Sequence, residues 1–178
     1  MGTFSDRLMR AARLDANLYE EVEADKHTMG QATAVVLLSS LAAGIGRVSS
    51  AGTEGIIIAI LAALIAWYVW AYLTYFIGTR VLPEPQTSAN LGELLRTIGF
   101  ASSPGLIRVF GIIPPLRVFV FAVAAVWMLA AMVIAVRQAL DYTSTWRAIG
   151  VCAIGWVIQT LVLAIILYWL GAPAVPPA

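Results

Sequence analysis

Long apolar stretches separated by short polar ones make up most of the chain after a charged N-terminal segment. Residues 1–28 carry Phe4, Leu8 and Ala11 at helical spacing, which predicts helix in this part. Five apolar stretches follow, at 29–48, 55–78, 94–113, 118–136 and 148–170. As a helix, the second stretch would extend about 36 Å, enough to cross a hydrocarbon core of about 30 Å with some tilt. The pattern predicts an all-α fold, a polytopic membrane bundle with five transmembrane helices. The tail at 172–178 is too short and too rich in proline to fold.

The third stretch differs from the others because Ser103 and Pro104 interrupt it. Asn90 and Glu93 predict the start of its helix, since the pair matches a capping box. Ser103 suits a helix cap and Pro104 suits the first position of a new helix, whereas Pro inside a helix removes a hydrogen bond. We therefore predict a break near 102–105, with the freed backbone groups facing protein rather than lipid. In the alternative topology this stretch is a re-entrant hairpin, which leaves four spans.

Composition supports a membrane protein. Hydrophobic residues make up 61% of the chain and charged residues 12%, whereas soluble domains carry roughly 25% charged residues. The net charge of +1 gives no cluster that would displace phosphate counterions, so we expect no nucleic-acid partner. Cys152 stands alone, which excludes an internal disulfide and a cysteine-rich metal site, and we expect no cofactor. Residues 1–28 lack the apolar core of a signal peptide.

Positive charge predicts the orientation in the cell (inner) membrane. With five spans, one side holds eight basic residues: Arg7, Arg10, Arg13, Lys26, Arg80, Arg96, Arg137 and Arg147. The other side holds Arg47 and Arg117, and Arg108 lies within the third stretch. Because cytoplasmic loops retain positive charge, the N-terminus should be cytoplasmic and the C-terminus outside. The four-span alternative divides the same residues seven to three.

The N-terminal segment carries a second prediction. Arg7, Arg10 and Arg13 lie beside Phe4 and Leu8, which suits an interfacial helix with its guanidinium groups among lipid phosphates. The alternative is a solvated helix packed on the protein's own loops. An acidic cluster follows, which would bind a cation or a basic partner or form a solvated helix face; it comprises Glu20, Glu21, Glu23 and Asp25.

Polar residues inside the predicted spans are the remaining candidate sites. Gln159 lies about 16 Å from either end of the fifth stretch at helical rise. Its buried amide needs a hydrogen-bond partner. Gln159 would either join two helices by a hydrogen bond or line a substrate path. An unpaired Arg108 would cost at least about 2.5 kcal/mol at the bilayer centre. We therefore expect Arg108 to reach outward and to pair with Glu54, with outer carbonyls or with lipid phosphate.

No set of residues in the sequence indicates catalysis, which needs several polar groups converging in one pocket. The single histidine, His27, lies at the membrane edge, and Glu54 suits a helix start, where the helix dipole favours a carboxylate. The first stretch places small residues four apart, such as Ser39 with Ala43, a pattern typical of close helix packing. We do not expect an enzyme.

The order of these features resembles the Yip family (Ypt-interacting proteins), in its bacterial branch. The resemblance rests on the charged segment 14–25, five apolar stretches, the Pro-broken segment 95–105 that closes at 112–114, and segment 135–148. It covers nearly the whole chain and implies a five-span fold with a cytoplasmic N-terminus. Eukaryotic members are associated with Rab-type GTPases and vesicle traffic. This chain lacks their long N-terminal region, so a GTPase partner is doubtful.

These observations favour a non-enzymatic integral membrane protein that acts through protein or lipid contacts, as a scaffold, an adaptor or a bilayer-organising protein. Its partners would be the lipid bilayer and either copies of itself or other membrane proteins. One alternative is a small transporter or channel that works as an oligomer, and another is a structural subunit of a larger membrane complex. A dry, packed bundle would favour the first hypothesis, and a continuous polar cavity would favour transport.

Overall fold

The computed structural model describes residues 2–47 and 54–169, without the side chains of 54–56, 58, 59, 163 and 166–168. Every regular element in these residues is helical, as predicted. In chain order they are α1 (Phe4–Ala12), α2 (Ala16–Ala24), η1 (Lys26–Thr28), α3 (Met29–Ile45), α5 (Glu54–Phe76), the π-helical η2 (Ile77–Val81), α6 (Leu91–Phe100), η3 (Ser103–Ile112), η4 (Pro114–Leu116), α7 (Arg117–Ala139) and α8 (Thr145–Trp169). Here η1, η3 and η4 are 3₁₀ helices.

Four helices in the described part of the chain are long and apolar enough to cross a membrane. They cover Lys26–Ile45, Ile60–Val81, Pro114–Ala139 and Thr145–Val162, and correspond to the first, second, fourth and fifth predicted spans. Their outer faces are apolar as well, since Ile65, Val126 and Trp156 are 66%, 71% and 67% exposed. Apolar surface this extensive indicates contact with lipid or with other proteins.

The third predicted span is built differently, from α6 and η3. We call these two elements, residues 91–112, the third segment. The capping box predicted at Asn90 and Glu93 is present, and it starts α6. The α-helix then ends at Phe100, and a 3₁₀ helix begins at Ser103.

Pro104 explains the break. In a continuous helix the N–H of residue 104 would donate to the carbonyl of Phe100, but proline has no N–H. The hydroxyl of Ser103 takes over and donates to that carbonyl at 2.6 Å. The cap position of η3 therefore falls on Ser102, which makes no side-chain capping bond. The expected cap at Ser103 is wrong, because its hydroxyl serves the end of α6 instead of the start of the next helix.

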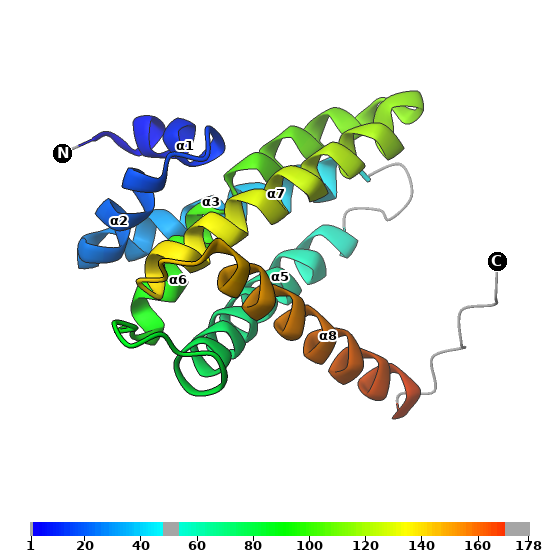
Figure 1. Ribbon diagram of the computed structural model, residues 1–178. Helices are drawn as coiled ribbons and strands as arrows, with labels where there is room; N and C mark the ends of the chain where they lie inside the picture. The colour runs from blue at the N-terminus through cyan, green and yellow to red at the C-terminus, as the bar shows by residue number, and fades with distance from the viewer. Residues whose placement is uncertain (1, 48–53, 170–178) are drawn as a thin grey trace.

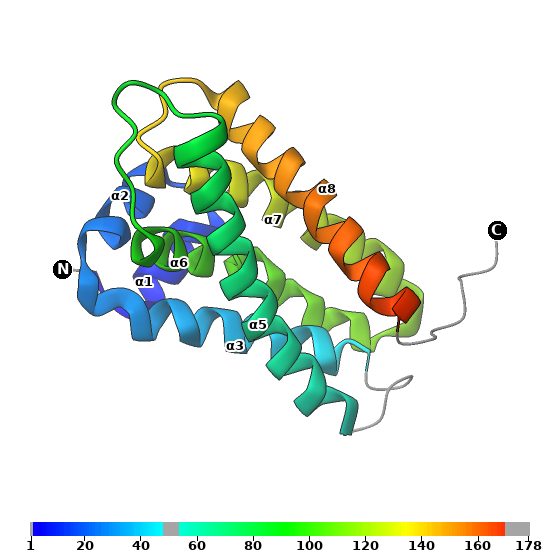
Figure 2. The same ribbon diagram turned by 90° about the horizontal axis from the view of Figure 1, so that it is seen from below.

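The first half of the third segment, α6, is largely buried, lies beside α3 and α5 (Figures 1 and 2) and also contacts α2. The second half, η3, packs against α3 and α7, and its residues Phe110 and Ile112 are exposed. At its far end, a Cβ on Gly111 would touch the ring of Phe121, near the start of α7. A Cβ on Gly46, at the end of α3, would collide with the backbone carbonyl of Arg108. Glycine at these positions allows η3 to approach both helices closely.

The two N-terminal helices pack against one end of the bundle (Figure 1). Leu18, Tyr19 and Val22 of α2 are completely buried, in a cluster that includes Phe100 and Ala131. The indole of Trp127, in the middle of α7, donates to the carbonyl of Ala12 at 2.8 Å. The N-terminal segment is thus a packed part of the fold.

We expect Gly46→Ala to destabilise the protein, because the added methyl group meets backbone that cannot move independently of η3. Overpacking of this kind costs about 1–3 kcal/mol. Gly30→Ala is the matched control in the same helix, since nothing lies within 4 Å of its added Cβ. It should be neutral or stabilise by up to about 1 kcal/mol, because Ala is the better helix former. Thermal melts of both variants in one detergent would measure this, and equal melting temperatures would contradict the tight contact between α3 and η3.

Candidate functional site

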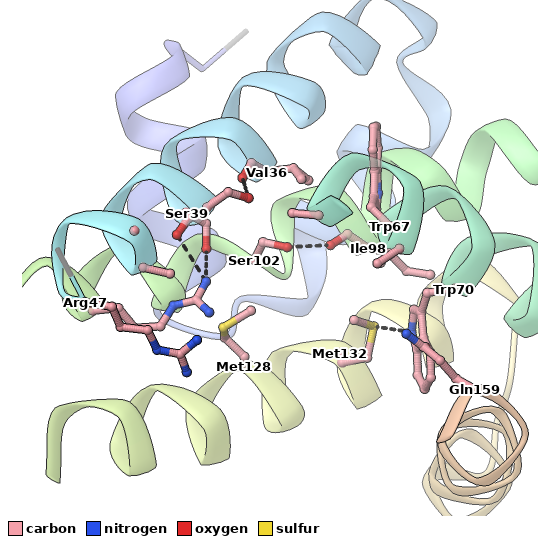
Figure 3. A pocket seen from close by; sticks show the side chains of 16 residues that line it. Val36, Ser39, Arg47, Trp67, Trp70, Ile98, Ser102, Met128, Met132 and Gln159 are labelled. Atoms are coloured by element: carbon pink, nitrogen blue, oxygen red, sulfur yellow. Dashed lines mark hydrogen bonds between the residues drawn. The ribbon is translucent and has the colours of Figure 1, made fainter. Parts of the chain in front are cut away.

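A cavity of about 500 Å³ lies between α3, α5, α7, α8 and the third segment (Figure 3). Most of its lining is apolar or aromatic, including Trp67, Trp70, Met128 and Met132. The polar side chains in the lining are Ser39, Ser40, Arg47, Ser102, Arg108 and Gln159. Two of the predicted polar sites, Arg108 and Gln159, thus face the same cavity although they are far apart in sequence.

Arg108 points toward the interior of the bundle. Its backbone carbonyl is level with Gly46, at the end of α3. Its guanidinium Nη2 donates to the hydroxyl of Ser39 at 2.7 Å and to the Ser39 carbonyl at 3.2 Å, and Nε donates to the Gly105 carbonyl at 3.0 Å. Ser39 lies seven residues before Gly46, which is about 10 Å along the helix. The expected outward reach of Arg108 is therefore wrong.

The acceptors that Arg108 binds are neutral. Among the residues whose side chains the structure describes, no carboxylate pairs with its guanidinium. The side chain of Glu54, the expected partner, lies outside the described residues. A second cation lines the same region, since the guanidinium of Arg47 lies 4.6 Å from the centroid of the Phe121 ring. The cavity thus has positive charge at the end near η3.

The opposite side of the cavity is aromatic and carries the amide of Gln159 (Figure 3). The indole N–H groups there have partners: Trp67 donates to the Leu95 carbonyl at 3.1 Å and Trp70 to the Met132 sulfur at 3.2 Å. Thr160 faces away, and its hydroxyl donates to the Trp156 carbonyl of its own helix. Gln159 makes no hydrogen bond with the described residues, so its amide remains available to whatever occupies the cavity.

Small residues of α3 create much of this space. Ser39, Ser40, Ala43 and Gly44 all line the cavity, so this face of α3 is not filled by a neighbouring helix. The close packing expected of small residues is found where α3 meets the third segment: a Cβ on Gly105 would collide with the Ser39 hydroxyl, and a Cβ on Gly46 with the Arg108 carbonyl. The hydroxyl of Ser40 is already used, since it donates to the Val36 carbonyl at 2.7 Å.

The N-terminal arginines are held by carboxylates of the protein. Arg7, whose side chain is 5% exposed, pairs with Glu21 at 2.9 Å and Asp25 at 3.1 Å, and also donates to Gln31 of α3. Arg10 pairs with the same Glu21 at 2.7 Å. Hydrogen bonds from Arg10 and then Arg7 lower the pKa of the Glu21 carboxyl. The charges that the sequence assigned to lipid phosphates thus join α1, α2 and α3 in the structure.

Arg10 also pairs with Asp15 at 2.8 Å, whereas the side chain of Arg13 is exposed. Of the three arginines predicted to contact the membrane surface, Arg13 is the one whose position leaves it open to such a contact. Contact with the membrane surface therefore stays a prediction for Arg13, whereas Arg7 and Arg10 form ion pairs within the protein.

Arg96 has a structural role that sequence reasoning missed. Its side chain is buried, and its guanidinium donates to the carbonyls of Val22, at 2.9 Å, and Glu23. These carbonyls end α2, where the helix dipole favours a cation. The signal available in the sequence was an arginine inside an apolar stretch, but its partners lie more than 70 positions away.

Glu84 was missed for a similar reason. It is 8% exposed and accepts hydrogen bonds from the backbone N–H and the hydroxyl of Thr143, at 3.0 and 2.8 Å. It also pairs with Arg147 at 3.4 Å. These contacts join the loop after α5 to the loop between α7 and α8. A carboxylate in a Pro-rich loop resembles any solvated loop residue, so no local pattern marked it.

A second hollow, of about 700 Å³, lies between α2, the start of α6 and the end of α7. It gathers much of the acidic charge near the N-terminal helices, from Glu20, Glu23, Glu93 and Asp141, beside Arg137. The pKa of Glu23 is raised to about 7. Burial is the largest cause, followed by the negative charges of Asp141, Glu93 and Glu20.

Arg7→Gln should destabilise the protein by about 1–3 kcal/mol, because it removes a buried charge that two carboxylates and an amide bind together. Arg13→Gln, on the exposed side of the same segment, should change stability by less than about 0.5 kcal/mol. Thermal or denaturant unfolding in detergent, followed by circular dichroism, would measure both. Equal losses would mean that the ion pairs of Arg7 contribute nothing to the fold.

Glu23 should make the stability depend on pH. Its carboxyl holds a proton more tightly in the folded state, with a pKa of about 7, than at its ordinary value of 4.5. The stability from this proton is present below pH 4.5 and is lost as pH rises through 7. Glu23→Gln should therefore raise the melting temperature at pH 8 and change it little at pH 4.5. A variant that behaves identically to the natural protein at both pH values would show that Glu23 is well solvated.

Among the described residues, no group of three or more His, Cys, Asp or Glu side chains is placed to hold a metal ion. A comparison with protein-family models matches residues 19–172 to the Yip1 domain. No curated protein and no solved structure matches the chain. The matched range includes the last six of the nine residues of α2 and every described helix after it, and its exposed apolar helices are those of a multi-pass membrane protein. The chain belongs to the Yip1 domain family.

Proposed function

We propose that this protein is a non-enzymatic integral protein of the cell membrane that acts through contacts with lipids and with other membrane proteins. The observation that carries the proposal is the apolar character of both its surface and its cavity. The lining that the described residues form contains serine hydroxyls but no His, Asp, Glu, Lys or Cys side chain, so none of its residues could act as a general base to activate a serine. Such a cavity suits the binding of an amphiphile better than catalysis.

Five spans, with the N-terminus in the cytoplasm and the C-terminus outside, agree best with the position of the third segment. Ten residues of α6 at 1.5 Å and ten of η3 at about 2.0 Å extend about 35 Å in total. That length suffices for a hydrocarbon core of about 30 Å. The segment begins near the end of α7, where Glu93 and Arg137 share one hollow, and ends near the start of α7 at Phe121. A re-entrant hairpin would return to the side from which it started.

Tryptophans at the two ends of α8 support the same placement. Trp146 and Trp169 are each 81% exposed. They are 23 positions apart in the sequence, about 35 Å of helix, which would put one indole at each membrane interface.

Transport by an oligomer is the second candidate, and the shared cavity of Arg108 and Gln159 is the observation in its favour. A transport path needs water or polar groups from one side of the membrane to the other. The polar lining consists of six side chains, of which Ser40 is already bonded within its own helix. The contact hypothesis therefore ranks first.

Labelling of single cysteines would test the function and the topology together. In a Cys152→Ala background, we expect Thr87→Cys to react with a membrane-impermeant maleimide only from the cytoplasmic side and Leu116→Cys only from outside. Ala66→Cys, in the cavity, should react from neither side. Labelling of Ala66→Cys from water would favour the transporter, and labelling of Thr87→Cys and Leu116→Cys from one common side would rule out five spans.

A further inference from the structure

We propose that the cavity binds the headgroup of a net-anionic phospholipid from the surrounding bilayer, with Arg108 as its principal ligand. This inference deepens the proposed function, because it rests on a protein that acts through lipid contacts and names the class of lipid. Its starting point is the direction of Arg108, whose backbone lies level with Gly46 at the end of α3 and whose guanidinium reaches back along that helix to Ser39.

An arginine near the edge of a membrane normally extends its side chain toward the interface, where water and phosphates solvate it. Arg108 has the opposite orientation, and the described acceptors that it binds, on Ser39 and Gly105, are uncharged. Uncharged acceptors orient a guanidinium but leave its charge uncompensated. An anion inside the cavity would supply that compensation.

The hydrogen-bond donors of Arg108 point to the same conclusion. Nε and Nη2 are used within the protein, while Nη1 makes no hydrogen bond with the described residues. No buried side-chain nitrogen or oxygen in the described part of the chain lacks a partner, so Nη1 keeps access to open space. Since Arg108 lines the cavity, that space includes the cavity. The guanidinium is thus fixed by two donors and offers a third to a ligand.

The rest of the lining suits the apolar part of a lipid. Beyond Arg108 the walls are Trp67, Trp70, Met128 and Met132, flexible or flat apolar groups that accommodate an alkyl chain. The amide of Gln159, on the side of the cavity opposite Arg108 (Figure 3), supplies one more polar contact. A volume of about 500 Å³ is within the usual range for a ligand site.

The same charge selects among phospholipids. The N–H groups of Nη1 can donate charge-assisted hydrogen bonds to a phosphate, and these are about twice as strong as neutral ones. A choline headgroup would bring its own ammonium close to the cation of Arg108, at a site without a described carboxylate to hold it. The cavity should therefore favour phosphatidylglycerol over phosphatidylcholine with the same acyl chains.

Lipid binding measured by native mass spectrometry would test this proposal. The protein, purified in detergent, is mixed with equal amounts of phosphatidylglycerol and phosphatidylcholine that carry identical acyl chains. We expect about a tenfold preference for phosphatidylglycerol. Arg108→Gln should abolish the preference and Arg108→Lys should keep part of it.

Arg117→Gln is the matched control, because Arg117 also donates to a backbone carbonyl of the third segment, that of Gly111 at 3.1 Å, but does not line the cavity. It should keep the preference. Ala66→Leu narrows the apolar part of the cavity without touching Arg108 and should lower retention of lipid, which keeps the test decisive if Arg108→Gln fails to fold.

Two results would overturn the proposal: equal retention of the two lipids by the natural protein, or an undiminished preference in folded Arg108→Gln. Displacement of the bound lipid by millimolar glycerol phosphate would show that the site takes water-soluble anions instead. These outcomes differ from failure of the proposed function, which would appear as labelling of Ala66→Cys from water.

Discussion

Backbone polar groups that lack a hydrogen-bond partner cannot face lipid, because hydrocarbon offers them none. In the third segment this constraint applies at the break, where α6 ends and a 3₁₀ helix of ten residues begins, a run longer than such helices usually contain. Residues 103–105 at the break are buried, and α3 and α7 both pack against η3, whose exposed residues Phe110 and Ile112 lie nearer its far end. Gly46 and Gly111 make the contact close, since a side chain at either position would meet backbone or the Phe121 ring. The break at Pro104 thus determines which helices surround the centre of the bundle.

The cavity follows from the same arrangement. Where Gly46 touches η3 there is no space between the helices, but deeper in the bundle α3 presents Ser40, Ala43 and Gly44, which are too small to fill the distance to α5 and α8. Arg108 leaves the backbone at the closed end. Arg47 and the Phe121 ring occupy that end, so the open direction for a long cationic side chain is inward. The direction of Arg108 thus has two causes: the close contact between Gly46 and η3, and the open face of α3 at Ser40, Ala43 and Gly44.

Apolar length and local turn chemistry made the helices predictable. Four apolar stretches became α3, α5, α7 and α8. The capping box of Asn90 and Glu93 located the start of α6, and Pro104 located its end. The destinations of the arginines could not be predicted, because they depend on residues distant in sequence. Arg108 meets Ser39 across 69 positions and Arg96 meets Val22 across 74. Arg7, read as a membrane contact from its neighbours Phe4 and Leu8, is enclosed by carboxylates of α2 and the turn that follows it.

Charge is divided unequally between the two ends of the bundle. Of the ten acidic residues, Glu54 alone belongs to the end where α3 finishes and α7 begins. Arg47, Arg108 and Arg117 all lie at that end, so basic residues outnumber acidic ones there among the residues that the structure describes. Around α2 the balance is reversed, and Glu21 and Asp25 neutralise Arg7 within the protein. Arg7 is thus bound by carboxylates of the protein, whereas the described acceptors of Arg108 are uncharged. In a bilayer the phosphates of lipids are an abundant source of the negative charge that would complement Arg108.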